Sequence, residues 1–256
     1  MAGQACPVPF GAWALKHWPD WPLEPGTERL AASGLTDRIR NARRWLSQSY
    51  AADLATKAGR RRAWWHFQLA DHGFLRSLWS NRSEIAPGVY RSNQPDPKRI
   101  AKLAEEGIRT IINLRAPIPS SYYLLEREAC AAQGIALISH QLSSGMLPPR
   151  AAVLALYQSF LAAEKPLMMH CKSGADRTGL AAALYLILIC DAPVADAARQ
   201  LHWRFLHFSG GPRGVLDFML TSYARAQAET GIPMLEWIKT VYDPVVLTAA
   251  YPAGTR

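Results

Sequence analysis

The segment 166–189 constrains the fold of this chain more than any other. It begins with an apolar run, continues through the ten residues His-Cys-Lys-Ser-Gly-Ala-Asp-Arg-Thr-Gly at positions 170–179, and ends in a long apolar helical pattern. The expected order is therefore strand, short loop and helix. Cys171 and Arg177 enclose five loop residues. A loop of this size can turn its backbone N–H groups inward and form a concave site for an anion.

The residue types in this loop predict its chemistry. The helix that we expect at 177–190 begins under the loop, and its N-terminal dipole adds positive potential. Arg177 offers a planar fork to two phosphate oxygens. The same field stabilises a thiolate, so we expect Cys171 to have a lowered pKa and to act as a nucleophile. Gly174 permits close backbone approach and unusual dihedral angles.

The run His-Cys-x5-Arg-Thr-Gly at 170–179 resembles the signature loop of the cysteine-dependent protein tyrosine and dual-specificity phosphatases. The resemblance covers about residues 86–210, where Pro-Gly-Val-Tyr-Arg-Ser-Asn-Gln-Pro at 87–95 is similar to the first strand of compact bacterial and fungal members. It implies hydrolysis of phosphomonoesters in two steps. A cysteine attacks phosphorus, a phosphocysteine forms, and water hydrolyses it.

Carried over to this chain, the resemblance implies Cys171 as nucleophile, Arg177 as phosphate binder, and Thr178 as an aid to thiolate release. We expect His170 to orient the loop through backbone carbonyls. The loop residues that would supply backbone donors are Lys172, Ser173, Gly174, Ala175 and Asp176. No cofactor is implied, and no His or Cys cluster has the spacing of a metal site. The alternative is that Cys171 and Arg177 only occupy a strand-to-helix turn.

The proton donor for the leaving group is a separate question. Many tyrosine phosphatases place an Asp on a separate loop, often as Trp-Pro-Asp, but the corresponding stretch 139–150 contains no carboxylate. A literal Trp-Pro-Asp at 18–20 precedes the phosphatase-like strands and is interpreted as a turn. Myotubularin-like and mycobacterial-type lipid phosphatases resemble this chain in having an Asp at the position of Asp176. We therefore expect Asp176 to donate the proton; alternatively, it holds the loop or pairs with a nearby base.

Strand and helix patterns alternate along residues 86–210. We expect strands at 89–91, 109–114, 135–139 and 166–170, and helices at 97–106, 120–133, 150–164, 193–208, 212–229 and 233–242. This pattern predicts an α/β fold with a mainly parallel central sheet flanked by helices. The loop then lies at the carboxyl end of a strand, where ligands bind in such sheets. We expect a phosphatase domain at 86–245 and a helical, basic extension at 1–85.

The extension is rich in tryptophan and arginine. It holds seven of the nine Trp residues, and between 38 and 82 ten Lys/Arg accompany only two acids, Asp53 and Asp71. We interpret it as a helical cap on the phosphatase domain. Its cations and aromatic rings also suit an anionic membrane surface. Nucleic acid is not an expected partner, because no recognised module accompanies the charge.

Composition indicates a globular chain, with 49% hydrophobic and 19% charged residues. We see no apolar run of membrane-spanning length and no secretory signal. A catalytic thiolate needs a reducing compartment, so the expected location is the cytoplasm, with a peripheral membrane position as an option.

The net charge of +9 attracts polyanions. Lys172 and Asp176 resemble residues of phosphoinositide phosphatases, so phosphoinositides or inositol phosphates are an alternative to phosphoproteins. For a phosphotyrosine pocket, Tyr122 and Tyr123 are candidate wall residues. A rhodanese-like sulfurtransferase is a weaker alternative. A third is a phosphate-binding module without catalytic activity. Further candidates for the pocket are Arg199, Arg204 and Arg213, whereas His140, His202 and His207 are interpreted as core or surface residues.

Overall fold

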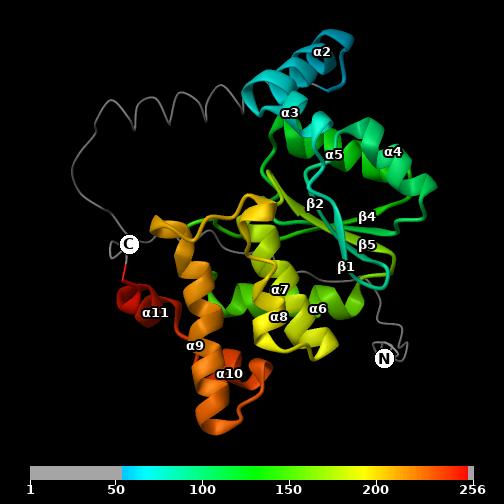
Figure 1. The fold of residues 1–256 in the computed structure, drawn as a ribbon. Helices are drawn as coiled ribbons and strands as arrows, with labels where there is room; N and C mark the ends of the chain where they lie inside the picture. Colours follow the sequence, from blue (N-terminus) through cyan, green and yellow to red (C-terminus); the bar gives the residue numbers. More distant parts are fainter. Residues whose placement is uncertain (1–53, 253–256) are drawn as a thin grey trace, which may run out of the picture.

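A computed structural model describes residues 54–252 of the 256-residue chain. Its centre is a five-stranded sheet in the order β1-β2-β5-β3-β4 (Figure 1). The strands are β1 Ser83–Ala86, β2 Val89–Asn93, β3 Thr110–Asn113, β4 Ala136–Ser139 and β5 Leu167–Cys171. Among these five strands, β1 pairs antiparallel with β2, and the other pairs are parallel. The predicted α/β fold with a mainly parallel sheet is confirmed.

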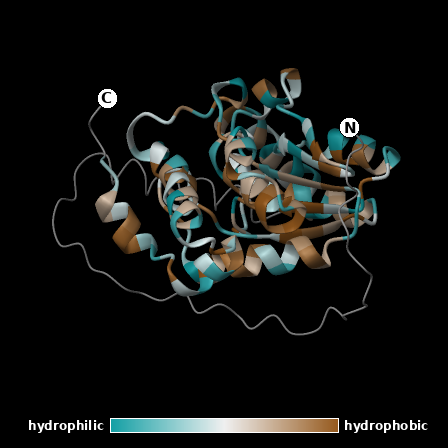
Figure 2. Ribbon diagram, turned by 60° about the horizontal axis from the view of Figure 1, so that its bottom comes forward, coloured by the Kyte–Doolittle hydropathy of each residue, from teal (hydrophilic) through white to brown (hydrophobic). Residues whose placement is uncertain are grey.

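Helices cover both faces of the sheet, because alternate strand residues point to opposite sides. Ile111 and Met168 pack in one apolar cluster with α4 Pro97–Glu105 and α5 Ser121–Ala132. Their chain neighbours Ile112 and Met169 pack in a second cluster with α6 Arg150–Ala162, α7 Asp176–Cys190 and α9 Val215–Thr230. Figure 2 shows apolar stretches along the strands and on the helices beside them. The central strands are therefore buried on both faces, as in other parallel sheets.

The helix that follows the loop is largely buried. Most of the residues of α7 are inaccessible to water, which explains why its sequence is apolar on all sides. At Gly179 a Cβ atom would lie 2.7 Å from the carbonyl oxygen of Gln200. The glycine thus lets the following segment pass directly against the helix that starts at the loop.

The helix expected at 193–208 is interrupted, and that prediction was wrong. The segment forms α8 Val194–Ala198 and a short 3-10 turn, η2 Trp203–Phe205. The physical cause is Arg91, a buried side chain of β2, whose Nη1 donates to the main-chain and side-chain oxygens of Gln200 at 2.7 Å each. Leu206 then takes a φ of 61°, which a helix cannot continue.

The C-terminal part differs less from expectation. A short 3-10 turn, η3 Gly211–Gly214, precedes α9, which is followed by α10 Met234–Thr240 and α11 Pro244–Ala250. The last helix runs past residue 245, and strand β1 begins before residue 86.

The described part of the extension, residues 54–82, is helical. It contains α2 Lys57–Trp65, the π-helical turn η1 His66–Ala70, and α3 Gly73–Leu78. It packs on α5, where His66 Nδ1 lies 2.7 Å from Ser121 Oγ and Arg60 donates to Glu128 at 2.6 Å. The Trp-Pro-Asp triplet at 18–20 lies outside the described residues. Among residues 54–252, no helix has both the length and the apolar character needed to cross a membrane.

Candidate active site

The loop lies at the carboxyl end of the central strand of the sheet. Cys171 is the last residue of β5, and Asp176 is the first residue of α7. Gly174 has a φ of +74°, and a Cβ atom there would lie 2.7 Å from the carbonyl oxygen of Ser92. Only glycine combines this conformation with such a close approach to β2. The loop is thereby held tightly against the sheet.

Cys171 is 1% exposed, and its surroundings favour the thiolate. Burial opposes ionisation, but the Arg177 guanidinium and hydrogen bonds from Thr178 and Gly174 lower the pKa of this thiol. The backbone amides of both residues contribute, together with the Thr178 hydroxyl. The arrangement favours the thiolate form of Cys171, which is the form of a cysteine that acts as a nucleophile.

His170 is fixed from the α5 side of the sheet. Its Nδ1 lies 3.2 Å from the carbonyl oxygen of Cys171, and its Nε2 lies 2.5 Å from Glu126 Oε1. Glu126 also accepts a hydrogen bond from Gln94 Nε2 at 3.0 Å. All three side chains are buried. Glu126 and Gln94 escaped notice in the sequence, although Gln94 belongs to the segment that resembles the first phosphatase strand.

Arg91 supports the loop from the β2 side. Besides its bonds to Gln200, its Nη2 donates to the carbonyl oxygen of Gly174 at 2.6 Å. The guanidinium carbon lies 3.6 Å from the centre of the Phe205 ring. Burial lowers the pKa of Arg91 to about 9, against the effect of the Cys171 charge. The fully buried cation therefore ties the loop to the segment after α8.

Asp176 lies beside His207, which is interpreted from the sequence as a core or surface residue. His207 Nδ1 lies 2.8 Å from Asp176 Oδ1, and His207 Nε2 lies 2.8 Å from Asp217 Oδ2. Arg213 Nε is 3.6 Å from the other Asp176 oxygen. Burial lowers the pKa of His207, but the hydrogen bonds and charges of the two aspartates raise it to about 9. At neutral pH the ring is therefore a cation that donates to both carboxylates. The interpretation of His207 as an ordinary core or surface residue was incomplete.

The other candidates lie away from this cluster. Arg199 is 79% exposed at its side chain and pairs with Asp196 at 3.6 Å. His140 is buried, with Nε2 at 2.9 Å from Ser159 Oγ. Arg204 lies 4.7 Å from the centre of the Phe205 ring.

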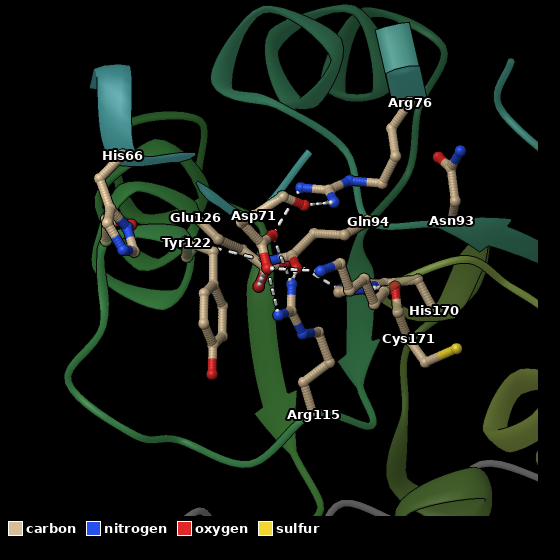
Figure 3. A network of polar contacts seen from close by, with 12 residues as sticks. His66, Asp71, Arg76, Asn93, Gln94, Arg115, Tyr122, Glu126, His170 and Cys171 are labelled. Carbon is tan, nitrogen blue, oxygen red and sulfur yellow. Dashed lines mark hydrogen bonds and ion pairs between the residues drawn. The ribbon is translucent and has the colours of Figure 1, made fainter. Parts of the chain in front are cut away.

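Lys172, expected to offer charge to a substrate, has an ion-pair partner in the extension. Its Nζ lies 3.4 Å from Asp71 Oδ1, and Arg115 Nη2 donates to the same oxygen at 2.7 Å (Figure 3). Arg76 Nη2 donates to the other oxygen at 2.7 Å. Tyr122, a candidate pocket wall, has its ring centre 3.6 Å from the Arg115 guanidinium carbon. In the sequence, Asp71 could have been noticed because it is one of only two acidic residues among the ten Lys and Arg residues of 38–82.

The extension also touches the loop directly. The Asn81 side-chain amide donates to the carbonyl oxygens of Ser173 and Phe205, both at 3.0 Å. The main-chain N–H of Asn93, at the end of β2, donates to the Ser80 carbonyl oxygen at 2.8 Å. Within residues 54–252, no group of His, Cys, Asp and Glu side chains is arranged to hold a metal ion.

A buried cysteine and an arginine thus close an anion-binding loop between the central strand of a parallel sheet and the helix behind it. This arrangement is that of the cysteine-dependent phosphatase class. Residues 86–191 match the family model described as "Polymorphic toxin system, DSP-PTPase phosphatase". This part of the chain is therefore similar to the cysteine-dependent dual-specificity phosphatases.

Curated relatives agree with this assignment. The dual specificity protein phosphatase TpbA of Pseudomonas aeruginosa is 29% identical over 111 residues, which cover 43% of this chain and 47% of the relative. The chain therefore spans about half the length of the curated relatives it matches. Among solved structures, P. aeruginosa TpbA is 23% identical with a TM-score of 0.45, covering 67% of this chain and 90% of that one. PTPMT1 is 16% identical with a TM-score of 0.44, covering 58% and 98%.

The raised pKa of His207 makes the stability of the fold depend on pH. Its ion pairs contribute fully below the ordinary histidine pKa of 6.5, and the contribution is lost as the pH rises through about 9. We expect the melting temperature of the wild type to fall more steeply between pH 7 and about 9.5 than that of His207→Gln. The exposed His202→Gln should keep the wild-type slope. Parallel curves for wild type and His207→Gln, measured by circular dichroism, would contradict this expectation.

Proposed function

We propose that this chain hydrolyses phosphomonoesters through a phosphocysteine, as a phosphatase of the tyrosine or dual-specificity type. The observation that carries the proposal is Cys171, a buried thiol of lowered pKa in a loop that Arg177 closes. A thiolate nucleophile and an anion-binding loop are the two components that phosphoryl transfer to sulfur requires. The similarity of residues 86–191 to the dual-specificity phosphatases supports it.

The reaction proceeds in two displacements. The Cys171 sulfur attacks phosphorus, and the bond from phosphorus to the leaving oxygen breaks while that oxygen takes up a proton. Water then attacks the phosphocysteine, releasing inorganic phosphate and the thiolate, which Thr178 stabilises. Arg177 binds two phosphate oxygens in both steps through its planar fork. In both steps the negative charge on sulfur and on the phosphate oxygens stays close to the loop donors and the Arg177 guanidinium, which stabilise it.

Asp176 and His207 together supply the proton in this proposal. His207, protonated at neutral pH, gives its Nδ1 proton to Asp176 across their 2.8 Å contact, and Asp176 delivers that proton to the leaving oxygen. In the second step the proton released by water returns by the same path. Asp217 touches only the far nitrogen of His207, at 2.8 Å, and so holds the ring in place. The pair occupies the role that a separate Trp-Pro-Asp loop has in other family members.

The first test is hydrolysis of 4-nitrophenyl phosphate. Cys171→Ser should lower kcat/KM by about a thousandfold or more, because the nucleophile is lost. The matched control is Cys190→Ser, a half-buried cysteine at the other end of α7, which should retain activity. Equal hydrolysis by wild type and Cys171→Ser would overturn the proposal. Turnover of thiosulfate without any phosphatase activity would favour the sulfurtransferase alternative.

A second test compares leaving groups. Asp176→Asn should slow hydrolysis of an alkyl phosphate by about a hundredfold, because the alkoxide needs a proton. It should slow 4-nitrophenyl phosphate by less than about threefold, because nitrophenolate leaves without one. Asp196→Asn, an exposed carboxylate on α8, serves as the charge-matched control. Equal slowing of both substrates would assign Asp176 a purely structural role.

For the location we propose the cytoplasm, where a free thiolate stays reduced, with the extension in contact with an anionic membrane surface. The support is an exposed apolar group on the described part of the extension. Leu69, Phe74, Leu75 and Leu78 are 60%, 46%, 53% and 83% exposed. Exposed cations of α2, Arg61 and Arg62, belong to the same helical cap. Apolar side chains beside cations suit a negatively charged lipid surface.

Sedimentation with lipid vesicles tests this contact. The protein should bind phosphatidylcholine vesicles that contain about 30% phosphatidylserine and release them at high salt. The double variant Leu75→Asp and Leu78→Asp should lose binding, because it places charge in the apolar face. Val245→Asp, 77% exposed on α11, is the control and should bind as the wild type does. Equal binding by the double variant and the wild type would refute the contact.

A further inference from the structure

The Asp71 carboxylate occupies the cationic cluster beside the loop. Its Oδ1 is shared by Arg115 Nη2 at 2.7 Å and Lys172 Nζ at 3.4 Å. Its Oδ2 receives Arg76 Nη2 at 2.7 Å and Arg115 Nη1 at 2.9 Å. Both carboxylate oxygens are therefore surrounded by cations, an arrangement also suited to two oxygens of a phosphate group.

The cluster is buried and charged. The side chains of Asp71, Arg76 and Arg115 are only 7%, 7% and 8% exposed, whereas Lys172 is 38% exposed. Burial raises the pKa of Asp71, but the hydrogen bond and charge of Arg115, with Arg76 and Lys172, hold it well below its usual range. The carboxylate is thus charged at neutral pH, and Lys172 is the member of the cluster most open to solvent.

The position of the cluster relates it to the loop. Lys172 directly follows Cys171, and Arg115 lies just beyond the carboxyl end of β3, the parallel neighbour of β5. Gln94 joins the two. Its main-chain N–H donates to the Lys172 carbonyl oxygen at 3.3 Å, and its side-chain oxygen accepts from Arg115. Figure 3 shows the Arg115 and Asp71 side chains meeting on one side of the strand that carries Cys171. The cations therefore adjoin the phosphate loop.

Asp71 itself comes from outside the matched phosphatase region. It sits in the turn between η1 and α3, where Arg76 Nη1 also donates to its main-chain carbonyl oxygen at 2.5 Å. The Arg76 guanidinium carbon lies 5.0 Å from the centre of the buried Phe67 ring. The apolar packing of the extension thus fixes the carboxylate in its position.

We propose that Asp71 is a specificity-determining residue: its carboxylate fills the place of a second phosphate, so that the site accepts esters with one phosphate and discriminates against polyphosphates. This rests on the proposed phosphatase function and names its substrate class. A single phosphate binds the loop between Cys171 and Arg177 and needs none of the cations that Asp71 engages. A second phosphate on the same molecule would find Lys172 and Arg115 already paired and would meet the Asp71 charge.

Lys172 therefore has a different effect in the fold from the one expected from the sequence. A lysine beside the nucleophile favours polyanions only when its charge is available to them. Here the extension supplies the compensating anion, so the net charge of +9 promotes encounter without creating a second phosphate subsite. The phosphorylated side chain of a protein is a substrate of the favoured kind, and an inositol polyphosphate is not.

The test measures binding in the Cys171→Ser background, so that it does not depend on turnover. Calorimetry would compare phenyl phosphate with inositol hexakisphosphate for Cys171→Ser alone and combined with Asp71→Asn. Asparagine keeps the size of the side chain and removes its charge. We expect the added Asp71→Asn to tighten inositol hexakisphosphate by about tenfold or more and to change phenyl phosphate by less than about twofold. Asp196→Asn, which changes the net charge equally on the surface of α8, should leave both unchanged.

Unchanged or weaker hexakisphosphate binding by a folded Asp71→Asn protein would overturn the inference. Because three cations lose their anion in that variant, Lys172→Met in the same background provides a second measurement. With Lys172 already engaged, hexakisphosphate affinity should fall by less than about threefold. A loss of tenfold or more, with phenyl phosphate little affected, would show that Lys172 is available to a second phosphate. Aryl phosphatase activity of the wild type separately decides the proposed function.

Discussion

A buried sulfur can carry a negative charge only where the surrounding groups replace the water it has lost. In this protein that condition is met at Cys171 by the Arg177 guanidinium, the Thr178 hydroxyl and the amides of Thr178 and Gly174. All of them depend on the tight curvature of one loop, and that curvature depends on Gly174 passing within contact distance of β2. Loosening the loop would withdraw several donors together, because they are held by one piece of backbone.

Buried polar side chains from several parts of the fold surround the loop. Arg91 ties the loop to the segment after α8, and His170 is held by Glu126 of α5. On the third side, Asp71 of the extension gathers Arg115 and Lys172 (Figure 3). Isolated buried charges are costly, and here every one of them faces an opposite charge or a carbonyl oxygen. The sheet, the C-terminal helices and the extension therefore all position the same short loop.

Local sequence predicted the sheet and the helices that flank it because each carries a complete pattern of its own. The apolar strands 109–114 and 166–170 and the apolar helix after the loop were placed to within a few residues. The helix expected at 193–208 failed for a reason that no local pattern contains: the buried Arg91 of β2 binds the carbonyl oxygen of Gln200. Strand β1 was missed because its four residues are only partly buried and carry little alternation.

The sequence by itself determined the candidate reactive centre, since Cys171, Arg177 and Gly174 lie within one loop whose geometry is local. What only the tertiary structure decided is which charges act on that loop. Asp71, Glu126 and His207 reach it from the extension, from α5 and from the segment before α9, and a pairing between distant segments leaves no periodic signal in either. The same lysine next to Cys171 is a free cation in the sequence and an engaged one in the fold. The physical reason is that the effect of a charge depends on its distance from other charges, and folding sets those distances.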